Sequence, residues 1–159
     1  ISGSNVVWDQ NWERVLFYNG ATTIQLTDSG GEQQISGSNI AWVGFDGSKT
    51  EVYFYNILTG ITTQVTNNNY EECLLRISGT NAAWSGGVDY GVFFYNGSTG
   101  ITTKLASDAG DQQISGSNVV WSGDDGVDQE IFFYNGSTIT QLTNNGNANY
   151  PQISGTNIA

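Results

Sequence analysis

The densest group of side chains with metal-ligand chemistry lies in the stretch DDGVDQE. It carries the carboxylates of Asp124, Asp125, Asp128 and Glu130 around Gly126. Closely spaced carboxylate oxygens beside a glycine are the hard ligands that Ca²⁺ takes in proteins. The spacing does not follow the EF-hand register, and the parallel stretches FDGSKTE and GGVDYG carry fewer acids. Two interpretations therefore stay open: a calcium site on these side chains, or an acidic loop that holds no metal.

Most other catalytic chemistry lacks its residues in this chain. There is no histidine, so a Ser-His-Asp triad and imidazole base catalysis are excluded. The single cysteine, Cys73, rules out an internal disulfide and a cysteine-based zinc site. Arg14 and Arg76 are too few for the arginine cluster with which sialidases bind a carboxylate. A carboxylate pair for glycoside hydrolysis is compatible with the composition but has no other support. We therefore expect a protein that is not an enzyme.

The charge of the chain excludes two classes of partner. Fifteen acidic residues oppose four basic ones, which gives a net charge of -11. Such a surface repels nucleic acid backbones and anionic lipid headgroups. No apolar run is long enough to span a bilayer. The chain begins with Ile and contains no Met, so we expect a processed or excised piece.

A repeated octapeptide organises the chain and must position these loops. The octapeptide is ISGSNVVW at Ile1 and again at Ile114, ISGSNIAW at Ile35 and ISGTNAAW at Ile77. A shorter copy, ISGTNIA, begins at Ile153. The repeats are therefore 1–34, 35–76, 77–113 and 114–152, with a partial copy at 153–159, all in a single domain. A period of about 40 residues without helical periodicity, rich in Gly, Asn, Thr and β-branched residues, predicts an all-β repeat protein.

Each repeat contains four segments of strand size. In the fourth repeat we expect strands at 112–115, 118–121, 130–135 and 138–143. The Ser-Gly-Ser-Asn between the first two segments predicts a type II′ hairpin, and the Asn-Gly between the last two, as in the first repeat, predicts type I′. The third segment (VLFY, VYFY, VFFY, IFFY) is apolar on both faces, as in a sheet packed between two neighbours. Four-stranded units that pack on one another predict a β-propeller. A linear stack of sheets and an ordinary β-sandwich are the alternatives.

The repeats differ only on one side of the predicted propeller. The hairpin between the first and second segments has the same length in every repeat, and the hairpin between the third and fourth segments differs by two residues among the repeats. The connection between the second and third segments, and the one that leads to the next repeat, vary freely in length. Because successive antiparallel strands reverse direction, the variable connections share one rim, and all fifteen acids fall in them or at their strand junctions. Either these loops form an acidic binding face, or acids gather there because strands disfavour them. Exposed aromatic candidates for ligand binding on this rim are Trp12, Phe45, Tyr70, Tyr90 and Tyr150.

The strand motifs resemble the repeats of TolB-like β-propellers, a bacterial family with WD40-like four-stranded blades. Pro151, the IFFYN of 131–135, Thr99-Gly100 and Leu142-Thr143 carry the resemblance, which extends over all four repeats. The Trp-Ser-Pro-Asp-Gly turn usual in the family is replaced here by Ile-Ser-Gly-Ser/Thr-Asn. The resemblance implies a setting in the bacterial envelope, the periplasm or outside the cell, and a role in protein or ligand binding. It assigns no catalytic residue.

Three kinds of function remain. The first is a non-enzymatic propeller that binds a protein partner through the acidic rim. The second is a multivalent carbohydrate-binding propeller, with sugars stacked on the loop aromatics. The third is a structural unit of a surface filament or sheath. We also expect self-association or continuation into further blades: the chain is a section of a longer propeller, or it completes its ring with a second copy.

Overall fold

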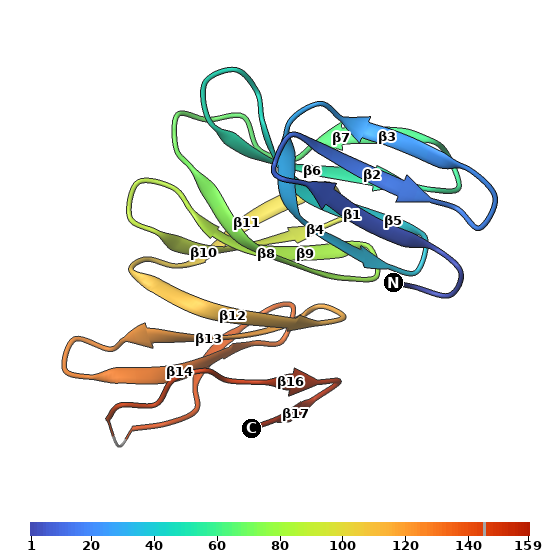
Figure 1. Ribbon diagram of the computed structural model, residues 1–159. Helices are drawn as coiled ribbons and strands as arrows, with labels where there is room; N and C mark the ends of the chain where they lie inside the picture. The colour runs from blue at the N-terminus through green and yellow to red at the C-terminus, as the bar shows by residue number, and fades with distance from the viewer. Residues whose placement is uncertain (145) are drawn as a thin grey trace.

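The computed structural model describes residues 1–144 and 146–159 and consists of antiparallel strands (Figure 1). Blade 1 is a three-stranded sheet of β1 (Val6–Gln10), β2 (Arg14–Tyr18) and β3 (Thr23–Thr27). Blade 2 contains β4 (Gly30–Ser36), β5 (Asn39–Phe45), β6 (Thr50–Asn56) and β7 (Ile61–Gln64). Blade 3 contains β8 (Glu72–Ser78), β9 (Asn81–Gly86), β10 (Gly91–Asn96) and β11 (Ile101–Ala106). Blade 4 contains β12 (Ala109–Ser115), β13 (Asn118–Asp124), β14 (Gln129–Tyr134) and β15 (Ile139–Gln141).

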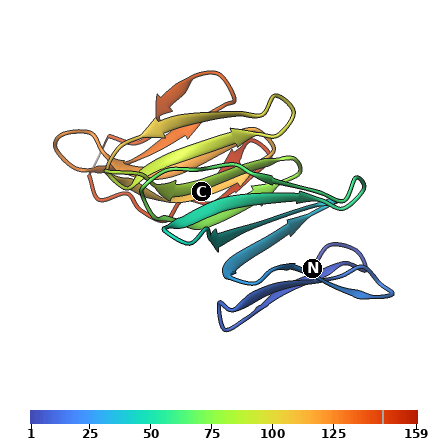
Figure 2. The same ribbon diagram turned by 90° about the horizontal axis from the view of Figure 1, so that it is seen from above.

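The C-terminal hairpin, β16 (Ile153–Ser154) and β17 (Asn157–Ile158), follows blade 4. The sheets succeed one another in chain order and form an open arc, with blade 1 at one end and the hairpin at the other (Figures 1 and 2). The first strands of successive blades, β4, β8, β12 and β16, lie side by side along the inner edge of this arc. None of the described residues form a helix with the length and apolar character needed to cross a membrane.

The four expected strands are present in blades 2 to 4, whereas blade 1 lacks the first of them, and the sheets do not begin where the sequence repeats begin. The second repeat starts at Ile35, near the end of β4, so the inner strands of blades 2 to 4 are longer than the sequence indicated. Each inner strand of blades 2 to 4 carries a register shift, between Gly31 and Gln34 in β4. The residue three positions before the repeat Ile has a positive φ in the last four copies, although none is glycine: Glu32, Leu74, Asp111 and Tyr150.

The two kinds of predicted turn have different outcomes. Gly37 has a φ of 58° while Ser38 does not have a positive φ, and Ser36 pairs with Asn39, as a two-residue II′ turn requires. The I′ prediction for Asn-Gly is wrong. Asn19 keeps a negative φ, and its side-chain Oδ1 accepts the N–H groups of Ala21 (3.0 Å) and Thr22 (2.9 Å). This side-chain bond closes a four-residue loop instead of a two-residue turn.

The core lies between neighbouring blades. We call the side of a blade that packs on the next blade its forward face, and the opposite side its backward face. A phenylalanine on each forward face meets a tyrosine on the next backward face: Phe17 with Tyr55, Phe54 with Tyr95, and Phe94 with Tyr134, with ring centroids 5.5 to 6.2 Å apart. The repeat tryptophans Trp42, Trp84 and Trp121 are buried on the backward faces. The third strands of blades 2 and 3, β6 and β10, are thus apolar on both faces because a neighbouring blade covers each face.

The repeated Ile-Ser-Gly-Ser/Thr-Asn motif joins each blade to the next. The N–H of Gly79 donates to Ser36 Oγ (2.9 Å) of the preceding blade, and its carbonyl accepts from Asn39 Nδ2 (3.0 Å). The same pair of bonds recurs at Gly116 and Gly155, and the serine bond alone at Gly37. We call this pair of hydrogen bonds the inter-blade clasp. It explains why the motif is constant in sequence and length.

Removal of one hydroxyl from the clasp should weaken it measurably. We expect Ser36→Ala to lower the free energy of unfolding by about 1 kcal/mol, because the Gly79 N–H loses its acceptor. Ser38→Ala, two residues away in the same turn, is the matched control and should change stability by less than about 0.5 kcal/mol. Urea unfolding followed by tryptophan fluorescence measures both. Equal effects of the two substitutions would refute the role of the Ser36 hydroxyl.

Candidate functional site

The five candidate aromatic side chains lie exposed on different connections of the loop rim, the rim formed by the variable loops. Their exposed fractions run from 43% for Tyr70 to 76% for Tyr150. Tyr70 lines a groove beside blade 3, and Tyr150 lines a cavity along the inner strands. Trp12 packs over the backbone of Gly31, where a β-carbon would lie 2.7 Å from its ring. The aromatics thus do not recur at one place from blade to blade.

Three of these aromatics have a left-handed backbone: Trp12 (φ 62°), Tyr90 (46°) and Tyr150 (57°). Such a conformation costs about 1 kcal/mol or more for a bulky residue, so something must hold it. Trp12 is held by its N–H, which donates to Asp9 Oδ2 (3.2 Å), and by its carbonyl, which accepts from Gly30 N–H (3.1 Å). Tyr150 occupies the inner-strand position that has a positive φ in blades 2 to 4. Its backbone geometry therefore belongs to the scaffold.

The candidate calcium ligands serve the loop itself. Asp124 accepts the N–H of Gly126, and Asp125 accepts those of Val127 and Asp128. The bonds from Asp128 and Val127 lower the pKa of Asp125. Glu130 is buried and accepts the N–H of Gly146 (2.6 Å) and the hydroxyl of Thr143. Within residues 1–144 and 146–159, no three acidic or sulfur ligands are grouped so that they could hold a metal ion.

Three of the rim acids turn inward, which the sequence did not indicate. Glu51, Glu72 and Glu130 are at most 3% exposed. Glu51 and Glu130 occupy equivalent positions, each paired with a glycine of the neighbouring strand. Each accepts a backbone N–H from the crossover, the segment that leads from its blade to the next inner strand. The N–H of Asn68 donates to Glu51 Oε1 (2.8 Å), and that of Gly146 donates to Glu130 Oε1. These two carboxylates fix the crossovers, whereas Glu72 faces a cavity.

We call that cavity, of about 310 Å³, the Trp84 groove. It lies between the crossover from blade 2 and the backward face of blade 3. Its walls come from the crossover (Thr66, Asn68, Tyr70, Glu72), from β9 and the following loop (Trp84, Gly87, Val88, Asp89), and from β10 and β11 (Phe93, Thr102, Lys104). Trp84 and Phe93 stack with ring centroids 5.8 Å apart and planes 11° from parallel. An aromatic floor thus meets a carboxylate and amide wall.

Glu72 leaves hydrogen-bonding capacity unused in the groove. Its Oε1 accepts from Asn68 Nδ2 (2.7 Å). Among the atoms that the structure describes, Glu72 Oε2 and the indole Nε1 of Trp84 are both buried and make no hydrogen bond of normal geometry, although the indole lies near enough to the carboxyl to lower its pKa. A β-carbon on Gly86 would overlap Glu72 Oε2, so the glycine makes the room that the carboxylate occupies. Buried polar groups without partners are uncommon and mark places where a ligand gains by binding.

Neighbouring glutamates here have opposite pKa shifts. Burial raises the pKa of Glu72 to about 7, against the opposing effects of the Asn68 and Trp84 side chains. The pKa of Glu71 is lowered to about 2, first by the hydroxyl of Thr50 and next by the ammonium of Lys49. Glu71 lies at the surface and stays ionised at neutral pH, whereas the Glu72 carboxyl changes its charge near pH 7. The groove therefore contains a titratable acceptor.

A lysine already occupies the mouth of the groove. Lys104 Nζ lies 6.0 Å from the centroid of the Phe93 ring and forms an ion pair with Asp89 (2.6 Å). Lys104 lowers the pKa of Asp89 through this contact. An ammonium above an aromatic ring and beside a carboxylate is the arrangement of a cation–π site. The contacts of Lys104 with Phe93 and Asp89 are thus an example, within the chain, of how this groove can bind a cationic group.

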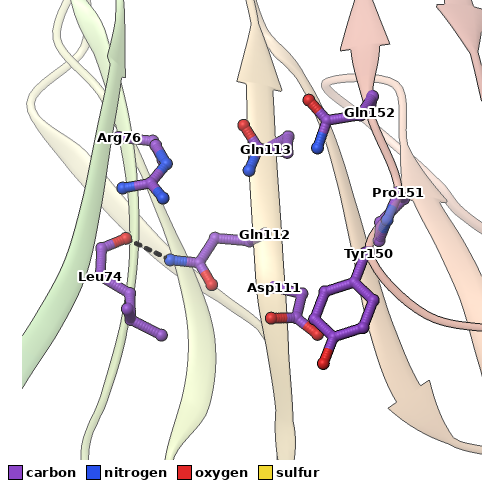
Figure 3. Close-up of a pocket in the computed structure, with 8 residues that line it drawn as sticks. All are labelled: Leu74, Arg76, Asp111, Gln112, Gln113, Tyr150, Pro151 and Gln152. Carbon is purple, nitrogen blue, oxygen red and sulfur yellow. Dashed lines mark hydrogen bonds between the residues drawn. The ribbon is translucent and has the colours of Figure 1, made fainter.

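A second cavity of about 200 Å³ runs along the inner strands (Figure 3). Arg76, Gln113 and Gln152 lie at one level on neighbouring strands, and Leu74, Asp111 and Tyr150 at the next. The side chain of Gln112 crosses between blades and donates to the carbonyl of Leu74. A third cavity, lined by Trp121 and Phe132 on blade 4, repeats the position of the Trp84 groove without a buried carboxylate. The Trp84 groove alone of these three combines stacked rings with a buried, partly unsatisfied acid.

Comparison with known proteins supports the architecture. No protein-family model matches the chain. No curated protein matches it either. Solved structures do match. The tricorn protease covers 90% of this chain with a TM-score of 0.68 at 15% identity, and the match takes in 16% of its own length. The computationally designed Ika8 protein covers 99% with a TM-score of 0.66 at 17% identity over 52% of its length.

TolB from Acinetobacter baumannii covers 84% of the chain with a TM-score of 0.53 at 16% identity, over 38% of its own length. The chain thus spans about half the length, or less, of these proteins. Identities this low establish the fold and nothing finer. Together with the four sheets in series and the cores between them, these likenesses show that the chain is an all-β protein with the β-propeller fold.

Proposed function

We propose that the chain is a non-enzymatic interaction module of TolB-like type that binds a basic segment of a protein partner on its loop rim. The observation that carries the proposal is the Trp84 groove, where the exposed ring of Tyr70, the partly exposed ring of Phe93 and the buried Glu72 carboxylate line one cavity. The rest of the rim supplies a negative field from acids that are mostly exposed, which steers a basic partner toward the groove. A lysine or arginine of the partner would lie over Tyr70 and beside Glu72.

The charge distribution supports a basic partner over an acidic one. Lys49 and Lys104 are both engaged in ion pairs with rim acids, Glu71 and Asp89. Their charges are thus neutralised locally, and the net charge of -11 remains on the rim. We place this module outside the cell or in a bacterial envelope, an assignment that rests on the low charge content and on the resemblance of the repeats.

Binding of a fluorescent lysine-rich peptide tests the proposal. We expect affinity to strengthen as the pH rises through about 7, because the Glu72 carboxyl ionises there and then attracts the cation. Glu72→Gln should abolish this pH dependence, and Tyr70→Ala should weaken binding about fivefold. Tyr150→Ala, an exposed tyrosine outside the groove, is the control and should bind as the parent does. A glutamate-rich peptide should not bind at all.

A carbohydrate ligand is the second candidate function. The repeated stacked pairs Trp84–Phe93 and Trp121–Phe132, each beside a cavity, favour it, because several equal sites would bind a glycan multivalently. The burial of both indoles opposes it, since a sugar needs an open ring face. A glycan array discriminates the two. Glycan binding together with no affinity for the lysine-rich peptide would reject the proposed function.

A further inference from the structure

The three interfaces between blades all pack the forward face of one blade on the backward face of the next. At the two ends of the arc, the backward face of blade 1 and the forward face of blade 4 have no such partner. Each internal interface joins a forward phenylalanine to a backward tyrosine and buries a backward tryptophan. On the backward face of blade 1, the equivalent side chains are Trp8, Leu16 and Tyr18. On the forward face of blade 4, the equivalent of Phe17, Phe54 and Phe94 is Phe133. The four copies of VLFY or its variants fix this equivalence by sequence.

These end faces are more exposed than their internal counterparts. Tyr18 is 36% exposed, whereas Tyr95 is 9% exposed. Trp8 is partly exposed, whereas the other repeat tryptophans are at most 1% exposed. Phe133 is partly exposed, while Phe54 and Phe94 are buried, and Leu142 is 44% exposed, whereas Leu105 at the same place in blade 3 is 8% exposed. The two faces are thus apolar, unpaired within the described chain, and complementary to each other by the same rule that joins the blades.

The sheet edges at the two ends are complementary as well. Blade 1 has three strands, and inside β1 it has only a single bridge between Ser2 and Asn5, whereas each of blades 2 to 4 has a full inner strand. At the opposite end, β16 lies beside β12 in the place of an inner strand and pairs only with the short β17. Its hairpin is already held to blade 4 by the clasp, through Ser115 and Asn118 to Gly155 (2.8 and 2.9 Å).

We propose that a second copy of this chain docks its blade 1 onto blade 4. In this junction β16 of one copy replaces Ile1 and Ser2 of the other, whose bridge to Asn5 opens, and pairs with residues 5–6 of that copy in place of β17. The exchange conserves the local sequence, because ISGTNI at 153–158 corresponds to ISGSNV at 1–6. Phe133 then meets Tyr18 of the second copy as Phe94 meets Tyr134, and Trp8 becomes buried. Exchange of an identical element between copies is a low-cost route to a dimer.

The junction is heterologous, since it joins unlike ends, and two of them related by a twofold axis close a two-chain ring. The residues that meet in the junction are apolar, so the negative charge of each copy lies outside it, on the loop rim. Repulsion between two chains of charge -11 opposes association, and salt screens it. Added salt should therefore strengthen the dimer, whereas it weakens binding of the lysine-rich peptide. This inference is independent of the proposed function.

Light scattering coupled to size exclusion, with sedimentation equilibrium over a range of concentrations, tests the junction. We expect the parent chain to show twice its 17.1 kDa mass. Tyr18→Asp should shift it to the single-chain mass, because the carboxylate would be buried against Phe133. Leu58→Asp replaces a residue that is 82% exposed in the turn between β6 and β7 and should leave the dimer unchanged. Circular dichroism and the melting temperature verify that each variant is folded.

A mixing experiment establishes the polarity of the junction. Phe133→Asp alone should also be a single chain. An equal mixture of the Tyr18→Asp and Phe133→Asp variants should regain a two-chain species, since one intact junction remains between an unaltered Tyr18 and an unaltered Phe133. A parent chain of single-chain mass at high concentration and high salt would overturn the proposal. So would a Tyr18→Asp variant that stays dimeric, or a mixture that stays monomeric. Open polymers would overturn the closed ring.

Discussion

Replacement of Trp84 by alanine should lower the free energy of unfolding by about 4 kcal/mol. The indole is fully buried between blades 2 and 3, stacks on Phe93, and packs in a cluster with Val52 and Leu75. Its removal leaves a cavity across the interface, and the strands around it are held by their own ladders and cannot collapse into it. Urea unfolding at low protein concentration measures the loss.

Trp8→Ala is the matched control for this substitution. Trp8 has the same place in the repeat but is partly exposed, so its truncation should cost about 2 kcal/mol. The difference between the two variants should narrow as the protein concentration rises, because a second copy that docks on blade 1 would bury Trp8. Equal costs at low concentration would contradict the account of an open blade 1.

The second large effect concerns the charge of Glu72. We expect Glu72→Gln to raise the free energy of unfolding at pH 8 by about 2 kcal/mol and to have no such benefit at pH 4. The folded-state pKa of this carboxyl is raised from 4.5 to about 7, so the native protein holds the proton more tightly than the unfolded chain. The cost of ionising a buried group is absent below pH 4.5, grows up to about 7, and is constant above. Urea unfolding at a series of pH values measures it.

Glu71→Gln provides a control of opposite sign at the adjacent position. The pKa of Glu71 is lowered from 4.5 to about 2, so the ionised carboxylate stabilises the fold above pH 4.5, and this contribution disappears as the pH falls toward 2. Glu71→Gln should therefore destabilise the protein at neutral pH, with a small effect because the group lies at the surface. A Glu72→Gln variant whose stability gain does not depend on pH would contradict the burial argument.

Much of the fold follows from the sequence because the spacings that are constant among the repeats indicate the register of the strands. The constant separation of Ile35 from Trp42 requires a constant hairpin, and the two-residue difference between the last hairpins keeps Phe17 and Phe54 on the same face. The alternation of Gly and non-Gly in Ser-Gly-Ser-Asn identifies the turn type correctly. These signals are local, and each is repeated several times.

The features that the sequence did not indicate depend on contacts between blades. The residues with a positive φ next to the inner strands, such as Leu74, are neither Gly nor Asn, so no local sequence preference predicts this backbone conformation. The Asn-Gly pair at Asn19 fails as a I′ signal because the asparagine side chain caps the loop. The clasp could not be predicted either, since its partners are about forty residues apart and each is a small polar residue of a kind common in turns.

The candidate site was predicted only in part. The sequence located the acids and exposed aromatics on one rim, and Tyr70 does line the groove. Glu72 was counted as one more surface acid, although it is buried; the glycine opposite it, Gly86, is the signal that could have marked it. The sequence marks Trp84 only as the last residue of the repeated octapeptide. That its side chain lines a groove becomes visible only when the position of the crossover over the backward face of blade 3 is known.

The clasp has a consequence for how this protein can change its length. Blades 2 to 4 each supply the serine and asparagine that bind the glycine of the next repeat, so the joints at Gly79, Gly116 and Gly155 contain the same two hydrogen bonds. Recombination between two copies of the octapeptide in the gene would remove or add whole repeats and leave every remaining joint intact. Insertions of any other size would break one. Such a chain grows and shortens by whole blades, and its variable loops diverge without disturbing the joints.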